Sequence, residues 1–557
     1  MAKNNRKIST PQSLNAYIKG ICDIMRRSGR AGALQYVPEL TWMLFLRILD
    51  EREEKEAEQA KAVGADFRPS LEYPYRWCDW AAPPQNKVKE SQGLKVQGLK
   101  RKELQNSTLG AFMSFVNAEL IPYLRDLKSK PGATPRQKVI SEVFSSIEKT
   151  GIDTERNLLD ILDKIHNLNV ELGMRNADIL ETPQSKIPQS TIRNQHSVTV
   201  DETHMFTLSQ VYEGLLQQMG EKNNDGGQFF TPREVIRVMV RVINPEVGET
   251  VYDPGCGTGG FLAQAYQLMR QKANTGEEIA ILKTSTFYGR EKENLVYPIA
   301  LANLVLQEID EPHIWHGNTL TGLEVYGGLF SSAPALFDVV LTNPPFGGKE
   351  GKEAQTCFAY KTSATQVLFL QHVMDSLKPG GRCGIVMDEG VLFRTNETAF
   401  VQTKRKLLNE CNLWLIVSLP PKVFMNAGAA SKTNLLFFNK GGPTKEIWYY
   451  DLSDINITKK QPLTAEQFEE FFQLLNAEFG MRNKDSPQST IKIPQSSWRS
   501  WRVPIEEIEA KNYDLKAVNP NRKNREDSRT PDELIAIIES QAVEITTAVQ
   551  ILRNKGI

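Results

Sequence analysis

A short polar segment follows an apolar run near the middle of the chain. Residues 337–341 read Phe-Asp-Val-Val-Leu, as expected for a buried strand, and Asn-Pro-Pro-Phe follows one residue later. The side-chain oxygen of Asn343 and the carbonyl oxygen of Pro344 are two acceptors. Pro345 keeps the backbone rigid, because proline has a fixed φ and no N–H. This set suits a planar ring with an exocyclic amine, which would stack on Phe346 while the amine donates two hydrogen bonds.

The amine of adenine fits this description and needs help to react. It is a poor nucleophile, because its lone pair is delocalised into the ring. Two acceptors on its hydrogens raise the electron density at nitrogen and favour a tetrahedral geometry. With a sulfonium methyl group held in line, transfer becomes an oriented displacement that requires no metal. Taken alone, the segment could equally be a turn with a buried phenylalanine.

A glycine-rich segment, Val-Tyr-Asp-Pro-Gly-Cys-Gly-Thr-Gly-Gly-Phe-Leu, occupies residues 251–262, between an expected strand and an expected helix. Its glycines let the backbone turn sharply and approach a ligand that the helix N–H groups face. Three of them satisfy the spacing G-x-G-x-x-G, which nicotinamide and flavin enzymes share: Gly255, Gly257 and Gly260. Asp253 before the glycines and Glu291 after the next expected strand favour another ligand. A carboxylate at Glu291 can accept both ribose hydroxyls of an adenosine.

The elements around these segments predict the fold. From about residue 205, short apolar strands alternate with helical patterns, which predicts a mainly parallel sheet with helices on both faces. Both chemical segments would then lie at the carboxyl ends of strands, where open α/β sheets bind ligands. The first 170 residues have helical apolar spacing, and the last 50 return to helix. We therefore expect an α/β fold preceded by a helical N-terminal domain and followed by a helical C-terminal tail.

The predicted boundaries divide the chain into four regions. They are a helical N-terminal domain at 1–170, a low-complexity insertion at 171–200, a catalytic domain at 201–445 and a C-terminal helical region at 446–557. Two further insertions are predicted at about 87–101 and 480–499. The last one shares GMRN, PQSTI and KIPQS with residues 173–195. Segments rich in Pro, Gln and Ser bury little surface, so we expect loops without a catalytic role.

Composition limits the class of protein further. A chain of 557 residues predicts two or three domains. Lys plus Arg equals Asp plus Glu at 67 each, so contact with DNA is expected to be local or shared with a partner. The six cysteines form no Cys-x-x-Cys pair, which indicates neither a zinc site nor a disulfide framework. No signal peptide or membrane-spanning run is evident, so a soluble cytoplasmic protein is expected.

The two motifs together resemble those of the amino-group DNA methyltransferases. More narrowly, the chain resembles HsdM, the modification subunit of type I restriction-modification systems. Residues 226–240, which begin Gly-Gly-Gln-Phe-Phe-Thr-Pro-Arg, lie just upstream, as the family's cofactor-contacting segment does. The segment Lys-Asn-Tyr-Asp-Leu at 511–515 is also similar to the family. The resemblance covers most of the chain outside the three insertions and implies N6-adenine methylation of DNA.

The resemblance also implies roles for individual residues. S-adenosylmethionine would contact Gln228, Phe229, Phe230, Thr231, Pro232 and Arg233. It would also contact Asp253, Gly255, Gly257, Thr258, Gly259 and Gly260, the last three at its amino acid end. Glu291 would hold its ribose, and Asn318, where the family often has Asp, would contact its adenine ring. The target adenine would be held by Asn343, Pro344, Pro345 and Phe346, with Phe424 stacking on its other face.

The resemblance implies partners as well. They are DNA, one specificity subunit joined by two modification subunits, and a restriction subunit; no membrane and no metal are implied. Three alternatives remain at this level. A nicotinamide-dependent enzyme would use the glycine segment but leaves Asn-Pro-Pro-Phe unexplained. A methyltransferase for protein glutamine or another planar amide could use such a tetrad, although the helical flanks argue against it. The third alternative, a non-catalytic scaffold, conflicts with the intact motifs at Gly257, Asn343 and Phe346.

Overall fold

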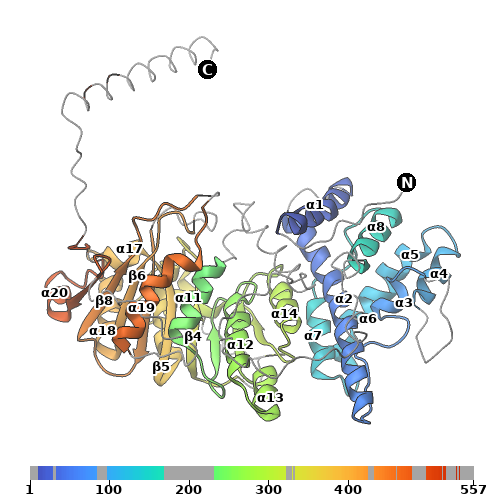
Figure 1. The fold of residues 1–557 in the computed structure, drawn as a ribbon, viewed down its shortest axis with the longest axis horizontal. Helices are drawn as coiled ribbons and strands as arrows, with labels where there is room; N and C mark the ends of the chain where they lie inside the picture. Colours follow the sequence, from blue (N-terminus) through green and yellow to red (C-terminus); the bar gives the residue numbers. More distant parts are fainter. Residues whose placement is uncertain are drawn as a thin grey trace, which may run out of the picture.

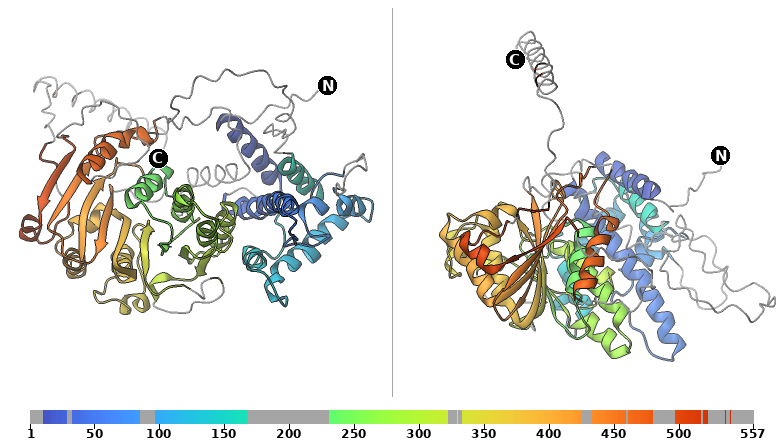
Figure 2. Two further views of the ribbon diagram at one scale, coloured as in Figure 1. Left: turned by 60° about the horizontal axis from the view of Figure 1, so that its bottom comes forward. Right: turned by 60° about the vertical axis from the view of Figure 1, so that its left-hand side comes forward.

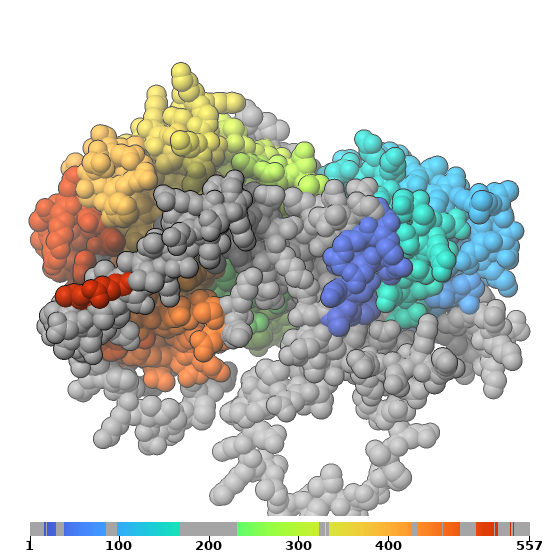
Figure 3. Space-filling view, turned by 90° about the horizontal axis from the view of Figure 1, so that it is seen from above, coloured from blue at the N-terminus to red at the C-terminus, as the bar shows by residue number. Residues whose placement is uncertain are grey.

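The chain folds into a helical part followed by a part built on one large sheet (Figure 1). The computed structural model describes residues 11–28, 33–84, 97–167, 231–321, 329, 333–424, 432–458, 461–479, 497–516, 518–521, 535 and 539. In the view of Figure 3 the two parts lie side by side, with the helical part in blue and cyan and the sheet-bearing part in green to red.

The sheet contains nine strands in the order β3-β2-β1-β4-β5-β7-β6-β8-β9. Their bounds are β1 Val251–Asp253, β2 Phe287–Glu291, β3 His313–His316, β4 Phe337–Thr342, β5 Leu377–Asp388, β6 Cys411–Ser418, β7 Thr433–Lys440, β8 Glu446–Asp451 and β9 Ser500–Pro504. The five strands from β3 to β5 pair in parallel, whereas β7 is antiparallel to both of its neighbours. Strands β1 and β4 lie at the centre of the parallel half, so their carboxyl ends are adjacent.

Helices cover both faces of the sheet, and the strand residues alternate between two cores. Val339 and Leu341 of β4 belong to the core on one face, while Val340 between them belongs to the core on the other. The first core is completed by α11 Arg233–Ile243, α12 Gly260–Lys272, α14 Tyr297–Leu306 and α19 Glu469–Phe479. The second is completed by α16 Thr365–Ser376, α18 Thr398–Glu410 and α20 Ile505–Ala510. The prediction of an α/β sheet with helices on both faces is confirmed (Figure 2).

The sheet extends past the predicted end of the catalytic region at residue 445. Strand β8 pairs in parallel with β6, and β9 pairs antiparallel with β8. The expectation of helix alone after residue 445 is therefore wrong for these two strands. Five of the six residues of β8 are buried, and a short apolar run of this kind has no alternation that distinguishes a strand from a helix.

The first part of the chain is helical, as predicted. Its elements are α1 Pro11–Arg27, α2 Ala33–Ala62, α3 Trp77–Trp80, α4 Leu99–Gln105, α5 Ala111–Ser114, the π-helix η1 Phe115–Leu120, α6 Ile121–Arg125, the 3-10 helix η2 Leu127–Ser129, α7 Pro135–Val143 and α8 Glu155–His166. Large rings fill its core: Trp42, Trp80 and Phe144 are fully buried, and the Trp42 ring contacts both of the other two. Aromatic side chains bury large apolar areas, which stabilises this part as a unit.

Charged side chains join the helical part to the sheet-bearing part. Arg52 of α2 donates to the carbonyl oxygen of Val305 in α14 at 2.9 Å and pairs with Asp310. Arg136 of α7 contacts the same Asp310 carboxylate at 3.2 Å and Glu56 at 2.7 Å. Because one carboxylate receives two guanidinium groups from two helices, these contacts fix the position of α14 against the helical part.

The predicted insertions differ from one another. Residues 171–200 lie outside the described residues, as do residues 480–496 of the last insertion. Of the insertion predicted at about 87–101, residues 87–96 lie outside the described residues. The remaining residues include the start of α4 at Leu99 and Arg101, which is buried and pairs with Asp163 at 2.6 Å. Within the described part of the chain, no helix combines the length and apolar character needed to cross a membrane.

Candidate active site

Four loops with predicted site residues leave the sheet at one edge. The register pairs Asp253 with Gly289 and Tyr252 with Val340, so β2 and β4 flank β1. Strand β3 pairs with β2 up to Glu291 opposite His316. All of these pairs are parallel, so the loops that follow the four strands emerge together. The carboxyl edge of a parallel sheet is the usual ligand site of open α/β folds.

The glycine loop between β1 and α12 is tied to β2 by a backbone hydrogen bond and requires glycine at defined positions. The Cys256 N–H donates to the Arg290 carbonyl at 2.9 Å, which ties the loop to β2. Gly257 and Gly259 have φ angles of 53° and 80°, in the left-handed region that favours glycine. A Cβ atom on Gly260 would lie 2.9 Å from Ile236 of α11, so glycine at the start of α12 allows the two helices to pack closely.

Glu291 at the end of β2 is buried and faces the glycine loop. Its Oε2 atom accepts the Gly257 N–H at 2.9 Å, and its Oε1 atom accepts the Glu293 N–H at 2.9 Å. Each carboxylate oxygen has two lone pairs, so each can accept one further hydrogen bond from a ligand hydroxyl. Burial raises the pKa of the Glu291 carboxyl to about 7, against the lowering effect of these N–H donors.

Asp253 is a second buried carboxyl at this edge. It is 1% exposed, and its Oδ1 atom accepts the Gly255 N–H at 3.1 Å, which shapes the first turn of the glycine loop. Burial raises the pKa of Asp253 to about 7, and the Glu291 charge adds to the rise. The geometry assigns Asp253 a role in holding the loop; its direct contact with a cofactor stays a prediction.

The loop after β3 carries Asn318 next to the glycine loop. The Thr319 hydroxyl donates to the Pro254 carbonyl oxygen at 2.5 Å, which joins the two loops. The Oδ1 atom of Asn318 accepts the Leu320 N–H at 2.9 Å within its own loop. The amide nitrogen of Asn318 can donate to a ligand, and its oxygen keeps a second lone pair; a contact with an adenine ring stays a prediction.

Asn343 begins the loop after β4 and has an unfilled acceptor. Its Nδ2 atom donates to the Thr231 hydroxyl oxygen at 3.0 Å. Its Oδ1 atom is buried and has no hydrogen-bond partner among the described residues. Buried amide oxygens are nearly always paired, because an unmade hydrogen bond costs about 1–3 kcal/mol. An acceptor of this kind is suited to a ligand that donates a hydrogen bond.

The Pro344 carbonyl is held by a residue that the sequence did not single out. Gln366 at the start of α16 is 4% exposed, and its Nε2 atom lies 3.5 Å from the Pro344 carbonyl oxygen. Its Oε1 atom accepts the Asp388 N–H at 3.0 Å, so one amide bridges the ends of β4 and β5. A carbonyl oxygen has a second lone pair, which leaves Pro344 able to accept from a ligand.

Two aromatic rings close the site on one side. Phe346 is half-buried, Phe424 is 2% exposed, and their ring centroids lie 5.3 Å apart at an interplanar angle of 61°. Edge-to-face contact leaves no room for a base between the rings as they stand. Stacking of a base between them therefore requires that the rings separate, and this role stays a prediction.

The predicted cofactor segment is described from Thr231 onward. Gln228, Phe229 and Phe230 lie outside the described residues. Pro232 and Arg233 form the start of α11, which packs on the sheet beside the glycine loop. The carbonyl oxygen of Thr258 accepts the Asn303 side-chain N–H at 2.9 Å, so α14 also supports that loop.

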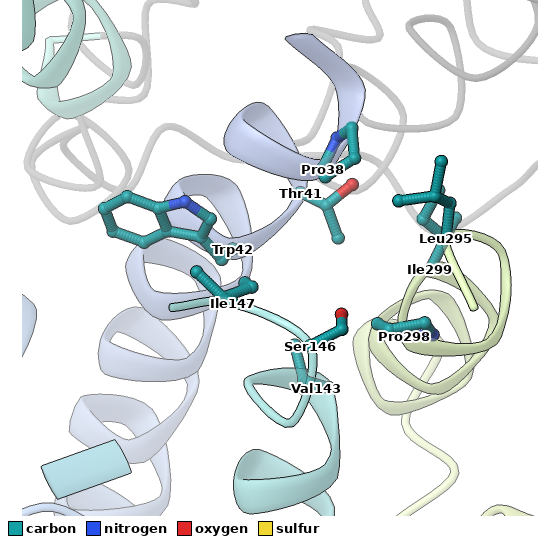
Figure 4. Close-up of a pocket in the computed structure, with 9 residues that line it drawn as sticks. All are labelled: Pro38, Thr41, Trp42, Val143, Ser146, Ile147, Leu295, Pro298 and Ile299. Atoms are coloured by element: carbon teal, nitrogen blue, oxygen red, sulfur yellow. The ribbon is translucent and has the colours of Figure 1, made fainter. Parts of the chain in front are cut away.

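A separate pocket lies between the helical part and α14 (Figure 4). It is lined by Pro38, Thr41, Trp42, Val143, Ser146, Ile147, Leu295, Pro298 and Ile299. Thr41 and Ser146 are its polar side chains, and none of the predicted site residues lines it. This pocket belongs to the junction of the two parts and not to the strand-end site.

The donor and acceptor set fits an adenosine-containing sulfonium cofactor. Glu291 offers acceptors for ribose hydroxyls, and Asn318 offers an amide N–H on the loop beside it. The glycine loop provides a backbone surface at the start of α12. A sequence signal could not have found Gln366 or the contact of Thr231 with Asn343. At Gly289 of β2, an added Cβ atom would lie 2.7 Å from Ile314 of β3 and 3.1 Å from the Cys256 sulfur of the glycine loop, so the close packing at this edge also requires glycine there.

The fold and this site define an α/β methyltransferase that acts on an amino group. The family model described as N-6 DNA methylase matches residues 203–529, and the model of the HsdM N-terminal domain matches residues 14–177. The chain belongs to the N-6 DNA methylase family and, within it, to the methylase subunits of type I restriction enzymes. The predicted resemblance is confirmed, and the chain is an N6-adenine DNA methyltransferase.

Relatives match over nearly the whole chain. The EcoEI methylase subunit of Escherichia coli is 33% identical over 543 residues, which cover 96% of this chain and 95% of that subunit. A modification subunit of a putative type I restriction enzyme from Vibrio vulnificus YJ016 has a TM-score of 0.69 at 30% identity, covering 93% and 98% of the two chains. A solved chain from a type I R-M system has a TM-score of 0.67 at 36% identity and covers 98% of both.

Cofactor binding is expected to weaken when Glu291 is changed to glutamine. Each lost hydrogen bond to a charged group costs about 1.5–3 kcal/mol, so calorimetry should show affinity for S-adenosylmethionine lowered by about tenfold to a hundredfold. We expect the ribose hydroxyls to bind the ionised form of the Glu291 carboxyl. The affinity of the wild-type protein for the cofactor is therefore predicted to rise as pH rises through about 7, and the affinity of the variant to rise less. Equal affinity and equal pH dependence in the two proteins would contradict the assignment of Glu291 to the cofactor site.

Proposed function

We propose that this chain is the modification subunit of a type I restriction-modification complex, and that it methylates an adenine flipped out of DNA. The donor is S-adenosylmethionine, held by the glycine loop and Glu291. The target amine is held by Asn343 and Pro344 with Phe346 beside its ring. The observation that carries this assignment is the buried Asn343 Oδ1 atom at the sheet edge next to the glycine loop, which has no hydrogen-bond partner in the described part of the chain.

The proposed mechanism uses the chain to orient the amine. When bound, S-adenosylmethionine supplies an electrophilic methyl group. Asn343 Oδ1 and the Pro344 carbonyl oxygen each accept one hydrogen of the adenine amine. These bonds would draw the nitrogen toward tetrahedral geometry and make its lone pair available to the methyl carbon. As the new N–C bond forms, the C–S bond of the sulfonium would break with its electron pair left on sulfur, and the methylated amine would lose one proton to solvent. The rigid Pro344-Pro345 backbone keeps both acceptors in place, so little reorganisation is needed when the bond forms.

Several contacts support the geometry of this mechanism. Asn343 follows β4, which pairs directly with β1, so the amide and the glycine loop lie on neighbouring strands. Gln366 contacts the Pro344 carbonyl and restricts its direction. The edge-to-face contact of Phe346 with Phe424 gives an apolar wall. Exclusion of water on that side would strengthen the hydrogen bonds to the amine.

Base flipping provides a direct test of this function. An adenine inside a duplex cannot reach Asn343, so the target nucleotide must leave the stack. DNA with 2-aminopurine at the target position is expected to brighten when the assembled enzyme and cofactor bind. The same analogue two positions away, inside the duplex, should stay quenched. Methylation of the site without brightening of the target analogue would contradict the flipping step.

We also propose that DNA contact is shared between subunits. The formal net charge of the chain is zero, and phosphate contacts usually require a basic excess. A specificity subunit, bound by two of these chains, would supply recognition of the DNA sequence. A restriction subunit would complete the assembly for cleavage.

A further inference from the structure

One hydrogen bond connects the start of the cofactor segment to the target-binding amide. The Asn343 Nδ2 atom donates to Thr231 Oγ1 at 3.0 Å, although the two residues are 112 positions apart. Resting on the proposed function, we propose that Thr231 is a positioning residue for methyl transfer: its hydroxyl holds the Asn343 amide so that Oδ1 faces the target amine.

The two ends of an asparagine amide are nearly equal in shape and opposite in hydrogen bonding. Oδ1 accepts a hydrogen bond, whereas Nδ2 in the same place would point its own hydrogens at the adenine amine. The Thr231 hydroxyl oxygen accepts a hydrogen bond from Asn343 Nδ2, and the buried Oδ1 atom has no partner among the described residues. The arrangement therefore presents the one atom of Asn343 that the reaction can use.

A purely structural role for the Thr231 hydroxyl has less support. A threonine before a helix commonly caps the first turn. Here the residue at the cap of α11 is Pro232, and no side-chain cap bond is made. Thr231 is half-buried, and its hydroxyl contacts the target site and not the helix that follows it.

The position of Thr231 also links the two halves of the site. Toward the N-terminus it continues into the segment for which cofactor contacts are predicted, and its side chain contacts the amide for the target base. A change in the position of the Thr231 hydroxyl would shift the Asn343 amide directly, because the two side chains are hydrogen-bonded. We therefore expect capture of the target base to depend on this hydroxyl.

The test compares Thr231→Val, which keeps the shape and removes the hydroxyl, with Thr231→Ser, which keeps the hydroxyl. The enzyme assembled with its specificity subunit is assayed on unmethylated chromosomal DNA. We expect Thr231→Val to lower kcat about tenfold, because it removes one side-chain hydrogen bond that is kept in the transition state. Its affinity for S-adenosylmethionine should stay within about twofold of the parent in calorimetry. Thr231→Ser should recover most of the rate.

A second readout follows the target base itself. In Thr231→Val the additional brightening of 2-aminopurine that cofactor causes is expected to shrink, and in Thr231→Ser it should remain. Thr284→Val is the matched control, because that threonine donates to Ala280 at 2.8 Å in α13 Gly276–Thr284 and should leave both readouts at the parental level.

The proposal is overturned if Thr231→Val keeps the parental kcat, if Thr231→Ser is as slow as Thr231→Val, or if cofactor affinity falls in parallel with the rate. These outcomes differ from failure of the proposed function. Full activity of the Asn343→Ala enzyme would contradict the proposed function. Loss of activity in Asn343→Ala together with full activity in Thr231→Val would contradict only the proposed role of Thr231.

Discussion

Replacing Asn343 with alanine is expected to abolish nearly all methyl transfer while the cofactor still binds. Asn343 Oδ1 is a buried acceptor that has no hydrogen-bond partner among the described residues. Its proposed bond to the amine strengthens as the nitrogen becomes tetrahedral. Removing one preorganised transition-state partner lowers kcat by about a hundredfold to a thousandfold. The loss should appear in kcat and kcat/KM alike, since the bond is used mainly in the transition state.

The experiment measures methyl groups transferred to unmethylated DNA and, separately, affinity for S-adenosylmethionine. Asn274→Ala serves as the matched control, because the Asn274 amide donates to the Lys272 carbonyl at 2.9 Å in an exposed turn. That variant should transfer at the parental rate. Transfer at the parental rate by Asn343→Ala, in a sample that binds cofactor normally, would remove the proposed mechanism.

The isolated chain is expected to bind cofactor but to methylate DNA poorly and without site preference. Sequence is read by contacts to base edges in the grooves, which need a dedicated surface. The structure leaves less chain for such a surface than the sequence suggested. Strands β8 and β9 join the catalytic sheet, and Ile508 of α20 and Leu515 are buried in the core on one of its faces.

The measurement is sequencing of modified bases in DNA treated with the chain alone and with the chain plus its specificity subunit. Specific binding is commonly tighter than non-specific binding by about a thousandfold or more. Addition of the subunit should therefore concentrate methylation at one split site and raise its rate at low enzyme concentration. Calorimetry with S-adenosylmethionine would serve as the control that the isolated chain is folded. Site-specific methylation by the chain alone would contradict this dependence and place recognition within it.

The sequence by itself determined the chemistry and the edge of the sheet where it occurs. Glycine at 257 and 259 and proline at 344 and 345 restrict the backbone locally, so their meaning is readable without distant contacts. The strand patterns before Asp253 and Asn343 predicted parallel strands, and parallel strands bring their carboxyl ends together. For that reason the glycine loop, Glu291 and Asn343 could be predicted to meet.

The tertiary structure alone decided which side chains hold those groups in place. The contact of Thr231 with Asn343, the bridge from Gln366 to Pro344, and the pairing of Arg52 with Asp310 each join distant segments. Nothing in residue type or spacing selects these partners, because each depends on how helices pack against the sheet.

The tertiary structure also decided the arrangement of the strands beyond β5. Strand β7 pairs between β5 and β6, and β8 and β9 extend the sheet past residue 445. Burial of β8 over nearly its whole length removes the alternation that marks a half-buried strand. Its partner β6 lies about thirty residues earlier in the chain. Long-range pairing and burial, which are properties of the packed molecule, therefore set the extent of the catalytic domain.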